Sequence, residues 1–216
     1  MGSNVVRCSP LVVFISCAKD RVMVVGITGT IGSGKTTLAG FFKEWGAALI
    51  EADRIGWEIL DRPEIREALI SEFGQTIVNE AGCVDRRLLG ERVFQGRDQL
   101  EKLNRIVHPT LLKELKKAID LRAKESKVVV VDAALIVEWG IADWFDKLIV
   151  LTCPESLKVG RLVEGGISED AARRRLACQL NDEERKRFPD FVVDNSGDIE
   201  DLRKKGRELF SVCGPA

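Results

Sequence analysis

The 216-residue sequence predicts an α/β fold in which helices flank a five-stranded parallel sheet. Short runs of aliphatic and β-branched residues recur along the chain, and each run is typical of a buried strand. Amphipathic segments of helical periodicity separate these runs, as in the βαβ units that build parallel sheets. The first run leads through a glycine-rich turn directly into a helix. Together these patterns favour an α/β fold with one long helical insertion.

The composition is ordinary for a soluble globular protein, with 45% hydrophobic and 31% charged residues. The 33 basic and 34 acidic residues nearly cancel. The overall charge therefore indicates neither a nucleic acid nor a membrane as partner, and any anion must be bound locally. No transmembrane-length apolar stretch is present. The six cysteines form no C-x-x-C pattern, which predicts a reducing compartment and a cytoplasmic location.

Residues 1–22 are expected to be an extension outside the fold. Their apolar run, Leu11–Cys17, resembles the core of a signal peptide but is short, and charged residues close it without a small-residue cleavage site. We interpret the segment as a non-essential extension, or as sequence upstream of a natural start at Met23.

The glycine-rich turn follows a first strand predicted over Val22–Ile27. It contains the pattern G-x-x-x-x-G-K-(S/T) at Gly29, Gly34, Lys35 and Thr36. Glycines in such a turn let backbone N–H groups point inward at a phosphate chain, and the next helix directs its positive end at the same anions. Lys35 is expected to reach the β- and γ-phosphates, and the Thr36 hydroxyl to bind Mg²⁺. A glycine turn that binds nothing is the alternative.

A carboxylate is expected beside this turn. The helix after the turn should end at Gly46, and a short strand is predicted over Ala47–Ile50. The carboxyl ends of parallel strands meet at one edge of the sheet, where ligands bind. Asp53, just after the strand, should therefore lie near the phosphate loop. A surface or helix-capping aspartate is the alternative.

Residues 54–125 have mostly helical periodicity. Helices are predicted over residues 64–73, 85–94, 99–107 and 110–124. An insertion of this length suggests a domain that holds a substrate, although a packing subdomain would have the same pattern. His108, the sole histidine, precedes Pro109 and marks a predicted helix break. It is either a binding residue or a turn residue.

A second carboxylate ends the third predicted strand, residues 127–131, which is apolar throughout. Asp132 at that position is expected to hold Mg²⁺ or its water, with a turn-capping role as the alternative. Two further strands are predicted over residues 148–152 and 191–193. A closing helix is predicted over residues 198–212.

Basic residues concentrate between the last two strands, at Arg161, residues 173–175 and residues 185–187. A solvated helix face is expected for most of them. One or two that face the phosphate loop would bind the transferring phosphoryl group.

Several segments together resemble dephospho-coenzyme A kinases over nearly all of residues 22–210. The phosphate loop GITGTIGSGKTTLA is shared by many ATPases and GTPases, but the later segments are more discriminating. They are EAD (51–53), GCVDRRLLGERVF (82–94), LNRIVHP (103–109), VVVVDAALIVE (128–138), RLACQL (175–180) and DFVVDNSGDIEDL (190–202). Ala134 replaces a proline expected in this family.

The resemblance implies a P-loop NTPase fold in three parts. These are a nucleotide-binding core (23–54, 126–154 and 188–216), a helical CoA-substrate domain (55–125) and a small helical lid (155–187). By the same resemblance, Lys35, Asp53 and Arg161 are catalytic, and Asp53 and His108 bind the acceptor. The residues expected to bind ATP are Gly32, Ser33, Gly34, Lys35, Thr36, Thr37, Arg161 and, beside the adenine, Asn195.

The lid departs from the family in one respect. Family lids commonly carry a further arginine shortly after the Arg161 position, in a stretch like M-x-R-D. Here residues 162–166 read LVEGG, which is one residue shorter and lacks that arginine. A second phosphate contact must come from elsewhere, with Arg185 and Arg187 as candidates, or it is weak.

The reaction implied is Mg²⁺-assisted phosphoryl transfer from ATP to the ribose 3′-hydroxyl of dephospho-CoA, the last step of CoA biosynthesis. Another small-molecule kinase, such as a nucleoside monophosphate kinase, is the alternative, because arginines at 86, 87, 92 and 97 could bind an acceptor phosphate. A nucleotide-binding switch module is disfavoured, because no Asn-Lys-x-Asp motif occurs. We expect a monomer or a weak homo-oligomer.

Overall fold

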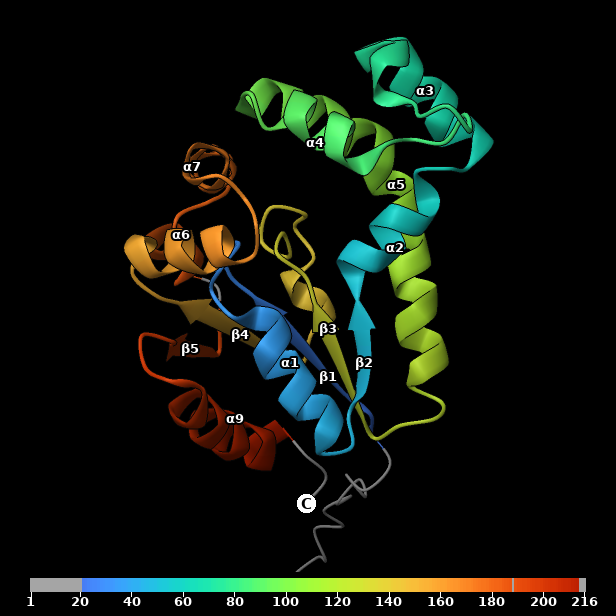
Figure 1. Ribbon diagram of the computed structural model, residues 1–216. Coiled ribbons are helices and arrows are strands. Elements are labelled where there is room, and N and C mark those ends of the chain that lie inside the picture. Colours follow the sequence, from blue (N-terminus) through green and yellow to red (C-terminus); the bar gives the residue numbers. More distant parts are fainter. Residues whose placement is uncertain (1–20, 188, 214–216) are drawn as a thin grey trace, which may run out of the picture.

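Five parallel strands form one sheet in the order β2-β3-β1-β4-β5 (Figure 1). The computed structural model describes residues 21–187 and 189–213, so residues 1–20 of the expected extension lie outside the described part. The strands are β1 (Met23–Thr28), β2 (Ala48–Glu51), β3 (Val128–Asp132), β4 (Lys147–Thr152) and β5 (Phe191–Asp194). The predicted five-stranded parallel sheet is confirmed.

Helices cover both faces of this sheet and extend beyond its carboxyl edge (Figure 1). The α-helices are α1 (Lys35–Glu44), α2 (Ala52–Ile59), α3 (Pro63–Phe73), α4 (Arg86–Val93), α5 (Arg97–Arg122), α6 (Glu155–Glu164), α7 (Glu169–Ala177), α8 (Asp182–Arg185) and α9 (Ile199–Cys213). Two 3₁₀ turns are η1 (Gln75–Ile77) and η2 (Ala142–Trp144). Within the described residues, no helix is long and apolar enough to cross a membrane.

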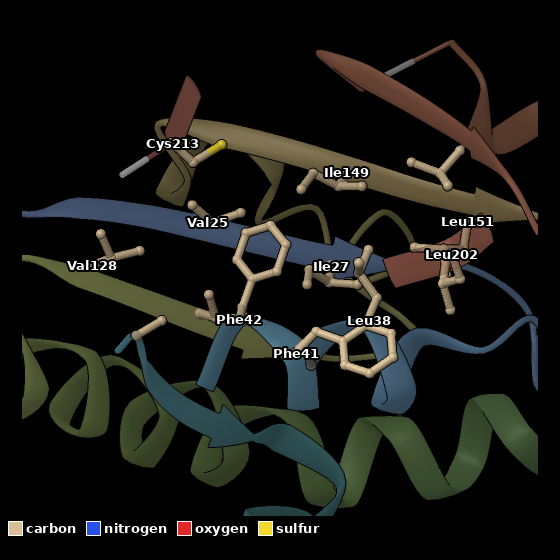
Figure 2. Close-up of a cluster of buried hydrophobic side chains, with 14 residues drawn as sticks. Val25, Ile27, Leu38, Phe41, Phe42, Val128, Ile149, Leu151, Leu202 and Cys213 are labelled. Atoms are coloured by element: carbon tan, nitrogen blue, oxygen red, sulfur yellow. The ribbon is translucent and has the colours of Figure 1, made fainter. Parts of the chain in front are cut away.

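The sheet is buried because alternate side chains of each strand enter two different cores. In β3, Val128 and Val130 face the core that α1 and α9 cover, whereas Val129 and Val131 face the core under α5. Burial on both faces explains why this strand is apolar throughout. Figure 2 shows Phe42 and Leu38 of α1 directed at the side chains of β1 in the first of these cores.

The long insertion has a hydrophobic core of its own. Helices α2 to α5 and η1 surround a buried cluster formed by Ile59, Leu60, Ile65, Leu69, Phe73, Ile77, Val84, Leu89, Val93, Val107 and Leu111. Helix α5 joins this cluster to the sheet, because Leu115 and Ile119 in its second half pack against β3. The domain boundary predicted between residues 125 and 126 therefore lies just after a helix that contributes side chains to both cores.

The predicted break at His108 is wrong, because α5 runs without interruption from Arg97 to Arg122 and contains Pro109. A proline inside a helix removes one backbone hydrogen bond, here the one that the carbonyl of Arg105 would accept. The buried side chains of Val107 and Leu111 lie on either side of the proline. Their packing keeps the helix continuous, so tertiary contacts override the local preference.

A smaller group of helices follows β4. In α6 and α7, Val159, Leu162 and Ala172 form a separate small cluster. Helix α7 begins directly after Ser168, whose hydroxyl caps the helix by accepting a hydrogen bond from the Ala171 N–H. Figure 1 shows α6 and α7 at the same end of the sheet as α2 and α4, where β2 ends.

The cysteines in the described part of the chain are free thiols: Cys83, Cys153, Cys178 and Cys213. Cys8 and Cys17 lie outside that part.

Candidate active site

A glycine-rich loop connects β1 to α1 at the carboxyl edge of the sheet. Gly29, Gly32 and Gly34 have φ angles of 149°, 79° and 97°, a region that side chains rarely adopt. A Cβ on Gly34 would lie 2.2 Å from Asn195 Nδ2, so the backbone approaches its neighbours closely. Helix α1 begins at Lys35 immediately after the loop, so its first N–H groups face the space above the loop. This is the geometry of an anion-binding loop.

Lys35 supplies a buried positive charge at this loop. The residue is 8% exposed, and Nζ donates a hydrogen bond to the Thr30 carbonyl at 3.2 Å. Burial lowers the pKa of Lys35, and the carboxylates of Asp132 and Asp53 oppose that shift. A bound polyanion would favour the charged ammonium further.

Thr36 and Asp132 meet where two neighbouring strands end. Asp132 ends β3 opposite Ile27 of β1, and the Thr36 hydroxyl donates a hydrogen bond to Asp132 Oδ2 at 2.7 Å. Burial raises the pKa of Asp132, and Lys35 counteracts it. Within the described ranges, no group of three or more acidic, histidine or cysteine side chains could hold a metal alone. A hydroxyl beside one carboxylate suits Mg²⁺ whose other ligands are waters and phosphates.

Asp53 lies in the first turn of α2, close enough to Lys35 for the two charges to interact. Although the residue keeps access to solvent, surrounding protein atoms disfavour the charged carboxylate and raise its pKa, while Lys35 lowers it. Asp53 therefore lies on the phosphate-loop side of the sheet, as its place after β2 suggests. A carboxyl group of raised pKa beside a cationic lysine is typical of a functional site.

Arg161 and Asn195 donate hydrogen bonds to backbone carbonyls of the loop. Arg161 donates hydrogen bonds to the carbonyls of Gly32 (3.3 Å) and Asn195 (3.0 Å). The buried Asn195 amide donates to the Ser33 carbonyl at 2.8 Å. The Asn195 side chain is thus bound to the phosphate loop, and the adenine contact expected for it stays a prediction.

A cavity of about 440 Å³ opens from the loop toward the helical insertion. Lys35 and Asp53 line it, with Ile31, Ala134 and Gln179 nearby. The helices, the residues just after α2 and α4, and the turns after β3 contribute the rest of the lining: Ala52, Gly56, Trp57, Leu60, Arg86, Leu89, Gly90, Val93, Phe94, Leu100, Leu103, Asn104, Val107, Leu111, Leu135, Trp139 and Arg175. A large, mostly apolar cavity with a few polar groups is typical of a small-molecule site.

His108 does not line this cavity. Its ring packs edge-on against Trp139, with centroids 5.6 Å apart, and Trp139 does line the cavity. Burial lowers the pKa of His108, so the imidazole is neutral near pH 7. Its Nε2 and the Trp139 Nε1 are buried without a hydrogen-bond partner among the described residues. A direct contact between His108 and an acceptor stays a prediction.

The arginine candidates for the second phosphate contact differ. Arg185 is fully buried and donates to Leu180, Thr28, Ala134 and Glu138, so its guanidinium is already engaged by the protein. Arg187 is exposed.

A different basic residue lies close to the phosphate loop. Lys158 in α6 is buried, and its backbone carbonyl oxygen lies 2.8 Å from the position that a Cβ on Gly32 would take. Its ammonium pairs with Asp182 at 2.7 Å, and Asp182 also accepts a hydrogen bond from Thr30 at 3.4 Å. Lys158, Asp182 and Thr30 therefore connect α6 and α8 to the loop.

Several residues of this site carry no individual sequence signal. Gln179 accepts a hydrogen bond from the Ile31 N–H at 2.9 Å, and Glu138 binds Arg185. Both lie within segments that carry the family resemblance, so those segments were the available signal. Trp57 and Trp139 gave none, because an isolated tryptophan is as typical of a core as of a binding site.

Comparison with known proteins identifies the family. The family model described as dephospho-CoA kinase matches residues 23–201. The chain belongs to the dephospho-CoA kinase family. A dephospho-CoA kinase of Fusobacterium nucleatum is 36% identical over 188 residues, which cover 85% of this chain and 95% of that protein.

Solved structures agree with this family. A dephospho-CoA kinase from Campylobacter jejuni has a TM-score of 0.64 at 27% identity. The matched region covers 87% of this chain and 95% of the Campylobacter chain. A shikimate kinase from Acinetobacter baumannii, at 15% identity and a TM-score of 0.52, covers 90% and 96% and shares the fold alone. The predicted P-loop kinase fold and phosphotransferase class are confirmed, and the dephospho-CoA kinase family is favoured over nucleoside monophosphate kinases.

Proposed function

We propose that this protein transfers the γ-phosphoryl group of ATP to the ribose 3′-hydroxyl of dephospho-CoA, producing CoA and ADP. The observation that carries the proposal is a cavity lined by both Lys35 and Asp53, which extends from the phosphate loop into the helical insertion. Such a cavity brings a donor phosphate and an acceptor hydroxyl together.

On the donor side, the loop amides and Lys35 bind the β- and γ-phosphates. The buried Ser33 hydroxyl has no hydrogen-bond partner among the described residues, which fits a group that is satisfied by nucleotide. Arg161 lies over Gly32 and adds positive charge as the γ-phosphoryl group moves. Thr37, exposed in the first turn of α1, contributes its N–H or hydroxyl to the same phosphates.

Thr36 and Asp132 are the residues that would hold Mg²⁺. The ion, when bound to ATP, neutralises charge on the β- and γ-phosphates. Asp132 accepts the Thr36 hydroxyl hydrogen bond, which orients the Thr36 oxygen at the end of the loop.

On the acceptor side, Asp53 accepts a hydrogen bond from the attacking hydroxyl and orients it. The transition state of phosphoryl transfer is loose, so the proton leaves late and orientation matters more than early deprotonation. The raised pKa of Asp53 keeps the carboxyl group ready to take that proton at the end of the step.

The helices over residues 155–187 act as a lid, and those over residues 55–125 as the acceptor domain. Closure of α6 over the loop excludes water, which would otherwise compete as the phosphoryl acceptor. Its placement of Arg161 on the loop supports this role.

Further parts of the proposal are a cytoplasmic location, a monomer or weak homo-oligomer, and no nucleic acid or membrane partner. The near balance of 33 basic and 34 acidic residues supports the last of these.

The test is a coupled ADP-release assay with ATP and Mg²⁺, comparing dephospho-CoA with AMP, CMP and shikimate as acceptors. We expect turnover with dephospho-CoA to exceed that with each other acceptor by orders of magnitude. Preference for a nucleoside monophosphate would overturn the proposal in favour of that kinase class.

A further inference from the structure

Two arginines face the cavity from opposite helices, and each rests on an aromatic ring. Arg86, the first residue of α4, has its guanidinium carbon 4.8 Å from the centre of the Trp57 ring. Arg175, in the last turn of α7, lies 5.3 Å from the centre of the Phe94 ring. All four residues line the same cavity as Lys35. Stacking on a ring holds a guanidinium in place while its N–H groups stay available.

One nearby arginine in each of these helices is bound differently. Arg87 donates to Glu91 at 2.9 Å, and Arg173 donates to Glu169 at 2.7 Å, both on the exposed surface. Among the described residues, no carboxylate oxygen lies within 4.0 Å of Arg86 or Arg175. In each helix, therefore, at least one arginine has an acidic partner, whereas the arginine that lines the cavity has none.

The charge of the cavity lining is strongly one-sided. Asp53 is the sole carboxylate among the described lining residues, whereas Lys35, Arg86 and Arg175 are cationic. The remaining lining is mainly aliphatic, aromatic or small. Lys35 and Asp53 serve the reacting groups, which leaves two guanidinium groups without an assigned anion. Arginine pairs of this kind bind phosphate groups through charge-assisted hydrogen bonds.

We infer that Arg86 and Arg175 bind the diphosphate of the acceptor, and that this contact selects a nucleoside 5′-diphosphate ester. The inference rests on the proposed function. In dephospho-CoA the 3′-hydroxyl and the 5′-diphosphate belong to one ribose, so a hydroxyl at Asp53 leaves the diphosphate within the same cavity. The uncharged pantetheine arm then meets the apolar lining.

The two arginines also lie on different parts of the molecule. Arg86 belongs to the helical insertion and Arg175 to α7, and the two parts already touch where Arg97 Nε donates to the Ala177 carbonyl at 3.4 Å. A diphosphate held by both guanidinium groups therefore connects α4 to α7 across the cavity. Acceptor binding consequently draws α7 toward the insertion and keeps water from the donor phosphate.

The experiment compares two acceptors in five proteins. Dephospho-CoA carries the diphosphate, and adenosine offers the same 3′-hydroxyl without it. The proteins are wild type, Arg86→Gln, Arg175→Gln, and the matched controls Arg87→Gln and Arg173→Gln. For Arg86→Gln and Arg175→Gln, we expect kcat/KM for dephospho-CoA to fall about tenfold or more, mainly through KM. In the same two variants, kcat/KM for adenosine and the KM for ATP should each change less than about twofold.

Calorimetric binding of dephospho-CoA provides a second measurement that needs no turnover. Its affinity should fall about tenfold or more in Arg86→Gln and Arg175→Gln, and stay near the wild-type value in both controls. Equal losses for dephospho-CoA and adenosine, or equal losses in the controls, would overturn the inference. Absence of turnover with dephospho-CoA in the wild-type protein would instead contradict the proposed function.

Discussion

Single residues at the phosphate loop combine burial with charge. Burial lowers the pKa of Lys35 and raises the pKa values of Asp53 and Asp132. The lysine and the two carboxylates oppose these shifts in one another, whereas the Asp53 charge raises the pKa of Asp132 further. Burying these charges costs free energy in the nucleotide-free protein. The phosphates of a bound nucleotide would further stabilise the charged form of Lys35. Lys35 is proposed to bind the donor phosphates and Asp53 to orient the acceptor hydroxyl, so substitutions of the two residues should have different effects.

The change Asp53→Asn removes the carboxylate while keeping the side-chain shape. We expect kcat for dephospho-CoA to fall by roughly 10²–10⁴-fold, because orientation and proton acceptance are lost, with ATP binding retained. Lys35→Ala should lower the rate by several orders of magnitude. Steady-state kinetics and ATP titration measure these effects, with Glu58→Gln, an exposed carboxylate of the same helix, as control. Turnover near wild type in Asp53→Asn would remove this residue from the chemistry.

The loop backbone has a more direct constraint at Gly34. Alanine there would meet Asn195 Nδ2 at 2.2 Å and would sit at a φ of 97°, so we expect ATP affinity to fall at least about tenfold. Gly40 in α1 is the matched control, because a Cβ there meets no atom within 4 Å. ATP titration of Gly34→Ala and Gly40→Ala tests the idea, and equal affinities would contradict the proposed role of the loop.

At the scale of elements, α5 connects the helical insertion to the sheet. Val107 and Leu111 near its middle pack in the insertion, and Leu115 and Ile119 further along the helix pack on β3. A helix that belongs to both cores transmits the position of the insertion to the phosphate-loop edge. The half-buried His108 lies near its middle, and it is the one histidine of the sequence.

The stability of the protein should depend on the protonation of His108. Because burial lowers its pKa in the folded state, the unfolded chain binds the proton more readily below its own pKa of about 6.5. Above about pH 6.5, where His108 is neutral in both states, the folded protein should have its full stability with respect to this residue. As pH falls below about 6.5, protonation of His108 in the unfolded chain should lower the free energy of unfolding. Urea unfolding at pH 7.5 and 5.5 should show a smaller loss for His108→Gln than for wild type. Parallel pH dependences would exclude His108 as the cause.

At the scale of the whole molecule, a buried ion pair joins the segment after α7 to the sheet edge. Arg185 is fully buried and binds Glu138, and it also donates to the Ala134 carbonyl at 2.7 Å. Glu138 further accepts from the Leu180 N–H at 3.3 Å. These contacts fix α8 beside β1 and β3, and α8 carries the Asp182 carboxylate that reaches the phosphate loop.

The change Glu138→Gln leaves the buried Arg185 without a counter-charge. We expect it to lower the free energy of unfolding by about 3–5 kcal/mol, as breaking buried pairs does. The exposed pair of Arg173 with Glu169 is the control, and Glu169→Gln should leave stability unchanged within error. Urea unfolding of both variants checks this, and similar stabilities would show that the Arg185 pair contributes little.

The sequence by itself determined the features that depend on local order. The phosphate loop, the alternation of strands with helices, and the carboxylates Asp53 after β2 and Asp132 at the end of β3 were all predicted, because side-chain period and turn chemistry act over a few residues. The family resemblance added the order of the parts. The break at His108 was the local prediction that failed, because packing on two cores outweighed the effect of Pro109.

Only the tertiary structure decided which residues of the basic segments are buried, paired or facing the cavity. Arg185 is buried at 0% exposure, Arg173 is paired at the surface, and Arg175 lies in the cavity wall. A run of arginines looks alike in sequence, whereas the environment of each depends on helices far away along the chain. Whether a charged side chain is buried, paired or exposed depends on those distant neighbours, since burial and ion pairing arise only in the folded protein.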